Sequence, residues 1–140
     1  MAGYSKTPLP KKLGIKPGVT VVAINPPKNY RRLLDSIPEG VRFSDRLNPD
    51  STFVHLFVRK YSELAKRLPV LRKKVSDTGI IWISWPKKSA GVPTDVTEDV
   101  IRAVALPVGL VDVKVCAIDE TWSGLKLMVR RENRKEASER

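Results

Sequence analysis

The chain has 140 residues, a hydrophobic content of 41% and a single cysteine, Cys116. This length and apolar content suit one domain with one ordinary core. A lone cysteine excludes an internal disulfide, and one cysteine with one histidine cannot build a structural zinc site. No stretch is apolar enough to span a membrane, and the N-terminus lacks the apolar segment of a secretory signal. The sequence therefore predicts a cytoplasmic protein without a metal.

Charge is the strongest global feature, with 26 Lys and Arg residues against 15 Asp and Glu residues and a net charge of +11. Such a balance favours polyanionic partners, such as nucleic acid, acidic proteins or an anionic surface, although it also serves solubility alone. Between Thr94 and Glu120, however, six acidic residues accompany only two basic ones. A molecule with one basic and one acidic side fits this distribution, and it could also self-associate.

The first half of the chain alternates predicted strands with short helices. Residues 8–15 hold a helical turn that ends at Gly14, and a Pro-Gly turn follows. Strands are predicted at 19–24, 41–45 and 52–58, with a short helix at 30–34. The strand at 52–58 is almost wholly apolar, as expected of a parallel strand that is covered on both faces.

The second half begins with a longer helix, because apolar residues recur every three or four positions from Tyr61 to Val75. Pro69 lies inside it, so we expect a kink or two abutting helices. A turn at 77–79 leads into an apolar strand at 80–86. A further helix begins near Thr94 or Asp95, either of which could cap it. Alternating strands at 113–118 and 125–129 are joined at hairpin length.

This order of elements predicts an α/β fold, namely a three-layer Rossmann-like domain with helices on both faces of the sheet. The sheet should be mostly parallel, with about six strands and a C-terminal antiparallel hairpin. A single domain should cover residues 1–131, and residues 132–140 form a charged tail.

The best candidate site is the loop after the strand at 80–86, because α/β folds bind ligands at the carboxyl ends of their parallel strands. This loop is basic, is interrupted by Gly and Pro, and leads to a helix start, where backbone donors and lysines can bind an anion. An ordinary solvated loop with a helix cap is the alternative. The predicted ligand-binding residues are Trp85, Lys87, Lys88, Ser89, Thr94 and Asp95, with Asp119, Glu120 and Trp122 from the hairpin.

Other residues with possible chemistry have simpler interpretations. The paired carboxylates Asp119 and Glu120 could act as acid and base if burial shifted one pKa, but an exposed hairpin tip has the same pattern. His55 lies in an apolar strand, which indicates a satisfied core histidine, and Cys116 is a packing residue. The three tryptophans, Trp82, Trp85 and Trp122, are predicted core or lid aromatics.

A basic helix face carries a separate hypothesis, that of non-specific nucleic-acid binding. It consists of Lys66, Arg67, Lys73 and Lys74. The sequence contains no helix-turn-helix, zinc-finger or RNA-recognition signature.

Two stretches and the closing hairpin carry a resemblance. LGIKPGVTVVAI at 13–24 and LRKKVSDTGIIWISWP at 71–86 resemble a reduced class I methyltransferase, a Rossmann-like fold that binds S-adenosylmethionine. In that family the first strand enters a glycine-rich loop that approaches the cofactor. Here the loop is Asn25-Pro26-Pro27-Lys28-Asn29, without glycine, and its prolines remove donors. Asp45 is a candidate for the acidic residue that binds the ribose, and one helix–strand unit is missing. S-adenosylmethionine is therefore disfavoured, and no cofactor is predicted.

Residues 4–131 also resemble a family of small bacterial proteins of unknown function, predicted to be methyltransferase-like without established activity. The segments that carry this likeness are TPLPKKLGIKPG, SWPKKSAGVPTD and KVCAIDETWSGL. The resemblance implies a fold and a bacterial cytosolic setting, and it implies no mechanism.

Three functions follow from the sequence. The leading one is a degenerate, non-catalytic methyltransferase-like domain that binds an anionic ligand or partner without methyl transfer. The first alternative is an enzyme that acts on a small anionic substrate at the sheet edge formed by residues 85–95 and 119–122. The second is non-specific nucleic-acid binding through the basic helix face.

Overall fold

The structure, a computed structural model, describes residues 7–134. The strands are β1 (Thr20–Ile24), β2 (Arg42–Ser44), β3 (Ser51–Phe57), β4 (Val75–Pro86), β5 (Leu110–Ala117) and β6 (Trp122–Val129). The main helices are α1 (Leu9–Leu13), α2 (Tyr30–Leu34), α3 (Tyr61–Lys74) and α4 (Glu98–Ala105).

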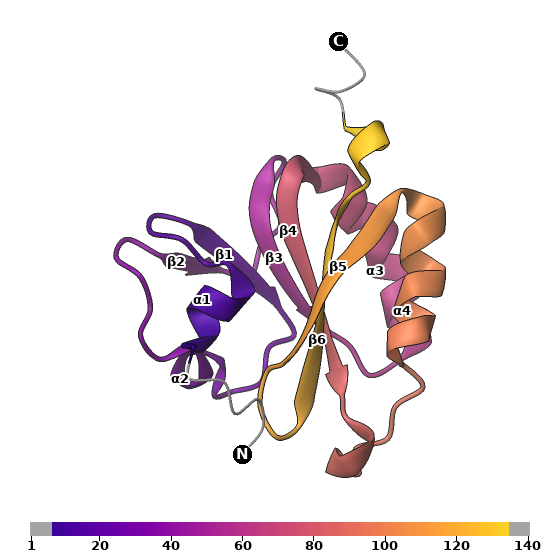
Figure 1. The fold of residues 1–140 in the computed structure, drawn as a ribbon, viewed down its shortest axis with the longest axis horizontal. Coiled ribbons are helices and arrows are strands. Elements are labelled where there is room, and N and C mark those ends of the chain that lie inside the picture. Colours follow the sequence, from indigo (N-terminus) through magenta and orange to yellow (C-terminus); the bar gives the residue numbers. More distant parts are fainter. Residues whose placement is uncertain (1–6, 135–140) are drawn as a thin grey trace.

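All six strands form one sheet in the order β2-β1-β3-β4-β6-β5 (Figure 1). Strands β2, β1, β3 and β4 are mutually parallel, whereas β6 is antiparallel to both of its neighbours. The predicted fold class, a largely parallel sheet with a C-terminal antiparallel hairpin, is therefore confirmed.

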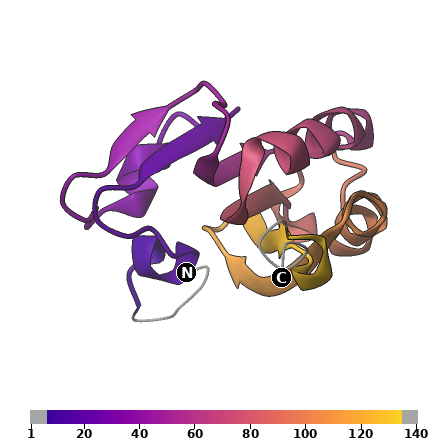
Figure 2. The same cartoon turned by 90° about the horizontal axis from the view of Figure 1, so that it is seen from above.

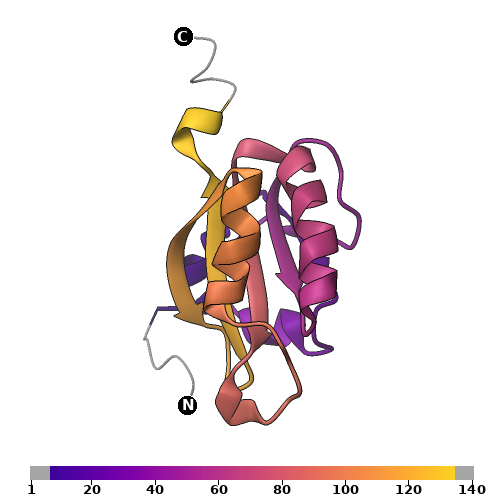
Figure 3. The same ribbon diagram turned by 90° about the vertical axis from the view of Figure 1, so that its right-hand side faces the viewer.

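Helices cover the sheet in two layers, with α1 and α2 on one face and α3 and α4 on the other (Figures 2 and 3). Alternation along the strands divides the apolar residues between two cores. In β1, Val21 and Ala23 pack in the core on the α1 and α2 side, while Val22 and Ile24 pack in the core on the α3 side.

The path of the chain places a topological switch point beside β1. After β1 the chain adds β2 on one side, and it then crosses to begin β3 on the other side. Only residues 45–50 make this crossover, although a connection between parallel strands usually needs a dozen residues or more and a helix. The α3 side of β1 is therefore crossed by a short irregular segment instead of a helix. Ligands in α/β folds bind at such switch points.

Several predicted boundaries differ from the structure. Helix α3 runs through Pro69 as one helix, so the alternative of two abutting helices is wrong. Its apolar stripe of Leu64, Leu68 and Leu71 is fully buried. Strands β5 and β6 begin at Leu110 and Trp122, each three residues before its predicted start. Strand β4 begins at Val75 and runs through the predicted turn at 77–79. Gly79 permits this path, since an added Cβ would lie only 2.6 Å from a methyl group of Val75.

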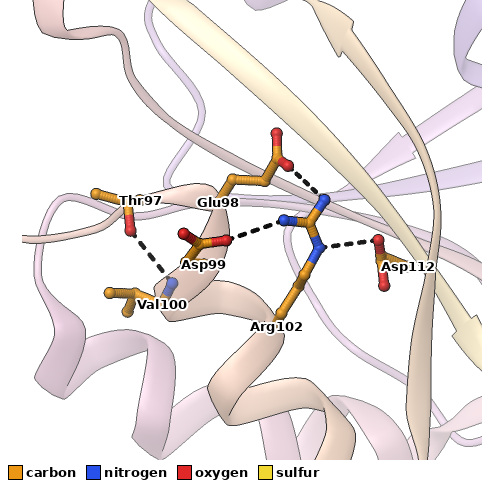
Figure 4. A network of polar contacts seen from close by, with 6 residues as sticks. All are labelled: Thr97, Glu98, Asp99, Val100, Arg102 and Asp112. Atoms are coloured by element: carbon orange, nitrogen blue, oxygen red, sulfur yellow. Dashed lines mark hydrogen bonds and ion pairs between the residues drawn. The ribbon is translucent and has the colours of Figure 1, made fainter.

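Helix α4 is capped by Thr97, whose hydroxyl accepts a hydrogen bond from the backbone N–H of Val100 at 3.2 Å (Figure 4). The predicted caps, Thr94 and Asp95, lie too early in the chain and are wrong. Instead, Thr94 contacts the segment before α3 and Asp95 contacts the first residue of α3, as described below.

Three acidic residues of α4 and β5 pair with one arginine, Arg102 (Figure 4). Its guanidinium pairs with Asp112 at 3.0 Å, with Asp99 at 3.1 Å and with Glu98. The hydrogen bond from Arg102 holds the pKa of the Asp112 carboxyl below its usual range, while the bonds to Asp112 and Glu98 raise the pKa of Arg102. This cluster joins α4 to β5, so these acids serve the fold.

Strand β5 is an irregular sheet edge. Its pairing with β6 shifts register between Asp112 and Lys114, which leaves Val113 in a bulge. Val113 is 53% exposed and Val115 is 48% exposed.

No helix within residues 7–134 is long and apolar enough to cross a membrane.

Candidate functional site

The pairing of β4 with β6 brings the predicted loop and hairpin side by side. Pro86 lies opposite Trp122, and the backbone N–H of Lys87 donates to the carbonyl of Thr121 at 2.8 Å. The tryptophans are buried, as predicted, but Trp85 packs in the core on the α3 side and Trp122 in the core on the α2 side. The two indoles therefore do not share one surface.

The polar residues of the loop hold the start of α3. The Thr94 hydroxyl donates to the carbonyl of Arg59 at 2.7 Å, and the Asp95 carboxylate accepts from the backbone N–H of Tyr61 at 2.6 Å. Asp95 thus satisfies a donor at a helix start that has no partner within its own helix. Lys88 and Ser89 are exposed in a short 3-10 turn.

Asp119 closes the hairpin between β5 and β6. Its carboxylate accepts from the backbone N–H groups of Thr121 at 2.9 Å and Trp122 at 2.7 Å. This arrangement mimics a backbone turn, so the side chain has a structural task. Glu120 is exposed beside it.

His55 lies at the centre of a buried hydrogen-bonded chain. Its Nδ1 is 2.9 Å from the Tyr30 hydroxyl, and its Nε2 is 2.7 Å from the Ser84 hydroxyl. His55 and Ser84 have no exposed surface. Burial lowers the pKa of His55 to about 3 and raises that of Tyr30. Both ring nitrogens have hydrogen-bonding partners, so the interpretation as a satisfied core histidine is confirmed.

Cys116 is half-buried on β5. Burial raises the pKa of its thiol, and the nearby charges of Lys12 and Lys114 oppose this effect. A protonated thiol is a poor nucleophile, so packing remains its interpretation. No cluster of metal-ligating side chains occurs among residues 7–134.

A groove of about 1030 Å³ lies beside the switch point, between α3, the end of β1 and the 45–50 crossover. Its wall on α3 includes Glu63, Lys66, Arg67, Val70, Leu71 and Lys74. The opposite side includes Ile24, Asn25, Pro26, Asp45 and Leu47. We call this feature the α3 groove. Three of the four residues predicted for nucleic-acid binding line it, while Lys73 is exposed on α3 outside this lining.

One acidic residue organises the end of the α3 groove that is next to β1. Glu63 accepts a hydrogen bond from the side-chain amide of Asn25 and another from Nε of Arg67, the latter at 3.3 Å. Within residues 7–134, the terminal nitrogens of Arg67 bond no other group, and Lys66 and Lys74 form no ion pair. The groove therefore contains three cationic side chains that remain available. Lys66 and Lys74 have no ion-pair partner within residues 7–134, and Glu63 neutralises Arg67 only in part.

Asp45 follows β2 and lies in the wall of the α3 groove. It also borders a second hollow of about 620 Å³ on the α2 side, which Lys28, Arg31 and Phe43 help to line. There the Arg31 guanidinium lies 4.4 Å from the centre of the Phe43 ring. Asp45 is thus at the carboxyl end of the sheet, where the resemblance placed it.

Sequence reasoning missed the α3 groove because its walls come from segments far apart in the chain. One signal was present: Glu63, Arg67, Val70 and Lys74 recur at helical spacing, separate from the buried stripe. A second was the short interval between the strands now seen as β2 and β3.

No protein-family model and no curated protein matches this sequence. Solved structures do match. A proposed type 11 methyltransferase from Sulfolobus solfataricus superposes with a TM-score of 0.61 at 13% identity, over 89% of this chain and 91% of its own. A ribosomal protein L11 methylase from Lactobacillus delbrueckii subsp. bulgaricus gives 0.54 at 10% identity, over 86% and 74%. LepI in complex with SAM gives 0.52 at 12% identity, over 87% and 39%.

The chain therefore has the Rossmann-like fold of class I methyltransferases. At these identities the likeness shows the fold alone, and function has to be argued from the site.

Proposed function

We propose that this protein is a methyltransferase-like binding domain that takes an anionic ligand or partner in the α3 groove and transfers no methyl group. The observation that supports this most is the groove itself. It lies at the switch point of the sheet, and Lys66, Arg67 and Lys74 line it without full neutralisation by residues of the fold. Cations that the fold leaves available suit an anion that arrives from outside.

The loop that follows β1 supports the proposal that this protein transfers no methyl group. Pro26 and Pro27 lack backbone donors, and the side chain of Asn25 is engaged by Glu63. A loop built this way offers few N–H groups to a bound cofactor. One fold hosts many activities, so the methyltransferase neighbours do not oppose a binding role.

We expect isothermal titration of the protein with S-adenosylmethionine to show no saturable heat, because the two prolines of the loop at 25–28 leave few backbone N–H groups for the cofactor. S-adenosylhomocysteine, whose sulfur carries no charge, provides a second probe in the same experiment. Tight, saturable binding of either compound would overturn the proposal that methyl transfer is absent.

Charge-reversal variants can show whether an anion binds in the α3 groove or at the predicted sheet-edge site. The variant Lys66→Glu with Lys74→Glu should lose most of the thermal stabilisation given by whichever nucleotide, sugar phosphate or oligonucleotide stabilises the wild type. The variant Lys87→Glu with Lys88→Glu changes the net charge equally and should retain it. The opposite pattern would favour the enzyme alternative at residues 85–95 and 119–122.

Nucleic-acid binding remains a second candidate, because Lys66, Arg67 and Lys74 share one surface. It requires an affinity for oligonucleotides that falls steeply with salt. A gel shift that is absent at low salt would remove this candidate.

A further inference from the structure

The α3 groove follows one face of α3 along nearly the whole helix. Its lining residues Glu63, Arg67, Val70 and Lys74 are spaced by four, three and four positions. At the helical rise of 1.5 Å per residue, the span from Glu63 to Lys74 is roughly 16 Å. A groove of this length matches about three turns of a second helix.

An apolar centre separates the positive positions of this groove. Arg67 and Lys74 are seven residues apart, or roughly 10 Å along the helix axis. Between them lies Val70, which is 47% exposed although it is a large apolar residue. Leu47 of the crossover lines the groove as well and is half-buried. Along the groove, the surface is therefore positive at Arg67, apolar at Val70 and positive again at Lys74.

Arg67 is oriented within the groove. Glu63 accepts from its Nε at 3.3 Å, while its side chain remains 41% exposed. The two terminal nitrogens, which bond no other group within residues 7–134, form the end of the guanidinium that binds a carboxylate with two parallel hydrogen bonds. A positioned arginine favours a carboxylate that arrives in a defined place.

We infer that the α3 groove binds an acidic, amphipathic helical segment of a partner protein. This inference rests on the proposed function and names the partner class for the same groove. On a helix, carboxylates at positions i and i+7 are also roughly 10 Å apart, so they can meet Arg67 and Lys74. Apolar residues at i+3 and i+4 of the same helix face lie against Val70 and Leu47, as in helix-in-groove recognition.

The lining favours an acidic peptide over a nucleic acid. Asp45 and Glu63 carry negative charge into the same groove, and a continuous phosphate backbone would be repelled by both. A phosphate backbone also gains nothing from the exposed apolar surface of Val70. A peptide places its few carboxylates selectively and uses the apolar centre.

The test uses fluorescence anisotropy with labelled peptides of about 15 residues, long enough for partial helix formation. The probe has Glu at i and i+7 and Leu at i+3 and i+4, and the control peptide has the same composition in scrambled order. The full chain should bind the probe at least ~10-fold more tightly than the scrambled peptide, since only the probe presents charges and apolar side chains together.

Matched protein variants locate the contact. Val70→Ser should weaken binding of the probe by roughly 5-fold, because it removes apolar contact without changing charge. Val113→Ser changes a similarly exposed valine on β5 and should leave binding unchanged. Circular dichroism and thermal unfolding of both variants confirm that each remains folded.

The outcomes separate this inference from the proposed function. If the scrambled peptide binds equally well, or if Val70→Ser has no effect, the peptide inference fails even where Lys66→Glu with Lys74→Glu abolishes binding of small anions. An oligonucleotide that binds more tightly than the probe, with dependence on Lys74, would also overturn it in favour of nucleic acid. If neither the peptide nor small anions depend on the groove lysines, both proposals fail.

Discussion

Lowering the pH from 6.5 to 5 should decrease the free energy of unfolding by about 1–2 kcal/mol, because His55 resists protonation in the folded state. Burial lowers its folded pKa to about 3, whereas an unfolded histidine titrates near 6.5. Between these values the unfolded chain binds the extra proton, so stability falls as the pH falls. Urea unfolding at half-unit steps measures this slope.

His55→Gln provides the control for this pH effect. The amide of glutamine can donate and accept hydrogen bonds toward Tyr30 and Ser84, but it does not titrate. The variant should therefore be less stable at pH 7 and should show a much flatter profile between pH 6.5 and 5. An equally steep profile in the variant would assign the effect to other groups. Below about pH 5 carboxylates also contribute, Asp112 among them, which is why the window stops there.

Trp82→Ala should decrease the free energy of unfolding by about 3–5 kcal/mol, the usual loss for a large aromatic in a core. The indole has no exposed surface, and its N–H donates to the carbonyl of Leu13 at 2.8 Å. Gly124 lies against its ring, where an added Cβ would be 3.1 Å from the nearest indole carbon. Trp82 thus fixes both the packing of the sheet and the position of α1.

Two further variants test this interpretation of Trp82 by chemical denaturation. Trp82→Phe keeps most of the buried ring and loses the N–H donor to Leu13, so it should cost about 1–3 kcal/mol. Leu106→Ala truncates a side chain that is 42% exposed and should cost about 0.5 kcal/mol or less. A similar cost for Trp82→Ala and Leu106→Ala would contradict the assigned role of the indole.

The fold was predictable from the sequence where periodicity was strong. The apolar run of β3, the stripe of α3 and the alternation of the final hairpin were recognised correctly. The start of β4 was not, because Asp77, Thr78 and Gly79 are typical turn residues. They lie where the pairing of β4 with β3 shifts register, between Val75 and Ile80, and Gly79 packs against Val75. Local preference does not report such tertiary contacts.

The candidate site was less predictable than the fold. The loop after β4 and the hairpin were correctly expected to be neighbours. Asp95, however, bonds the backbone of Tyr61, which is far away in the chain, so no local pattern reveals this contact. The α3 groove requires knowledge that residues 45–50 pass over β1. That path follows from the strand order β2-β1-β3, which the order of elements along the chain does not determine.

The irregular edge of β5 also restricts how this protein can associate. A long, flat edge strand invites strands from other chains and leads to aggregation, and bulges, charges and short edges prevent this. Here the bulge at Val113 and the charge of Lys114 interrupt one edge, and β2, only three residues long, forms the other. Strand addition is therefore disfavoured at both edges despite the exposed valines. The helical layers, where the α3 groove lies open, are the surfaces on which association is not disfavoured in this way.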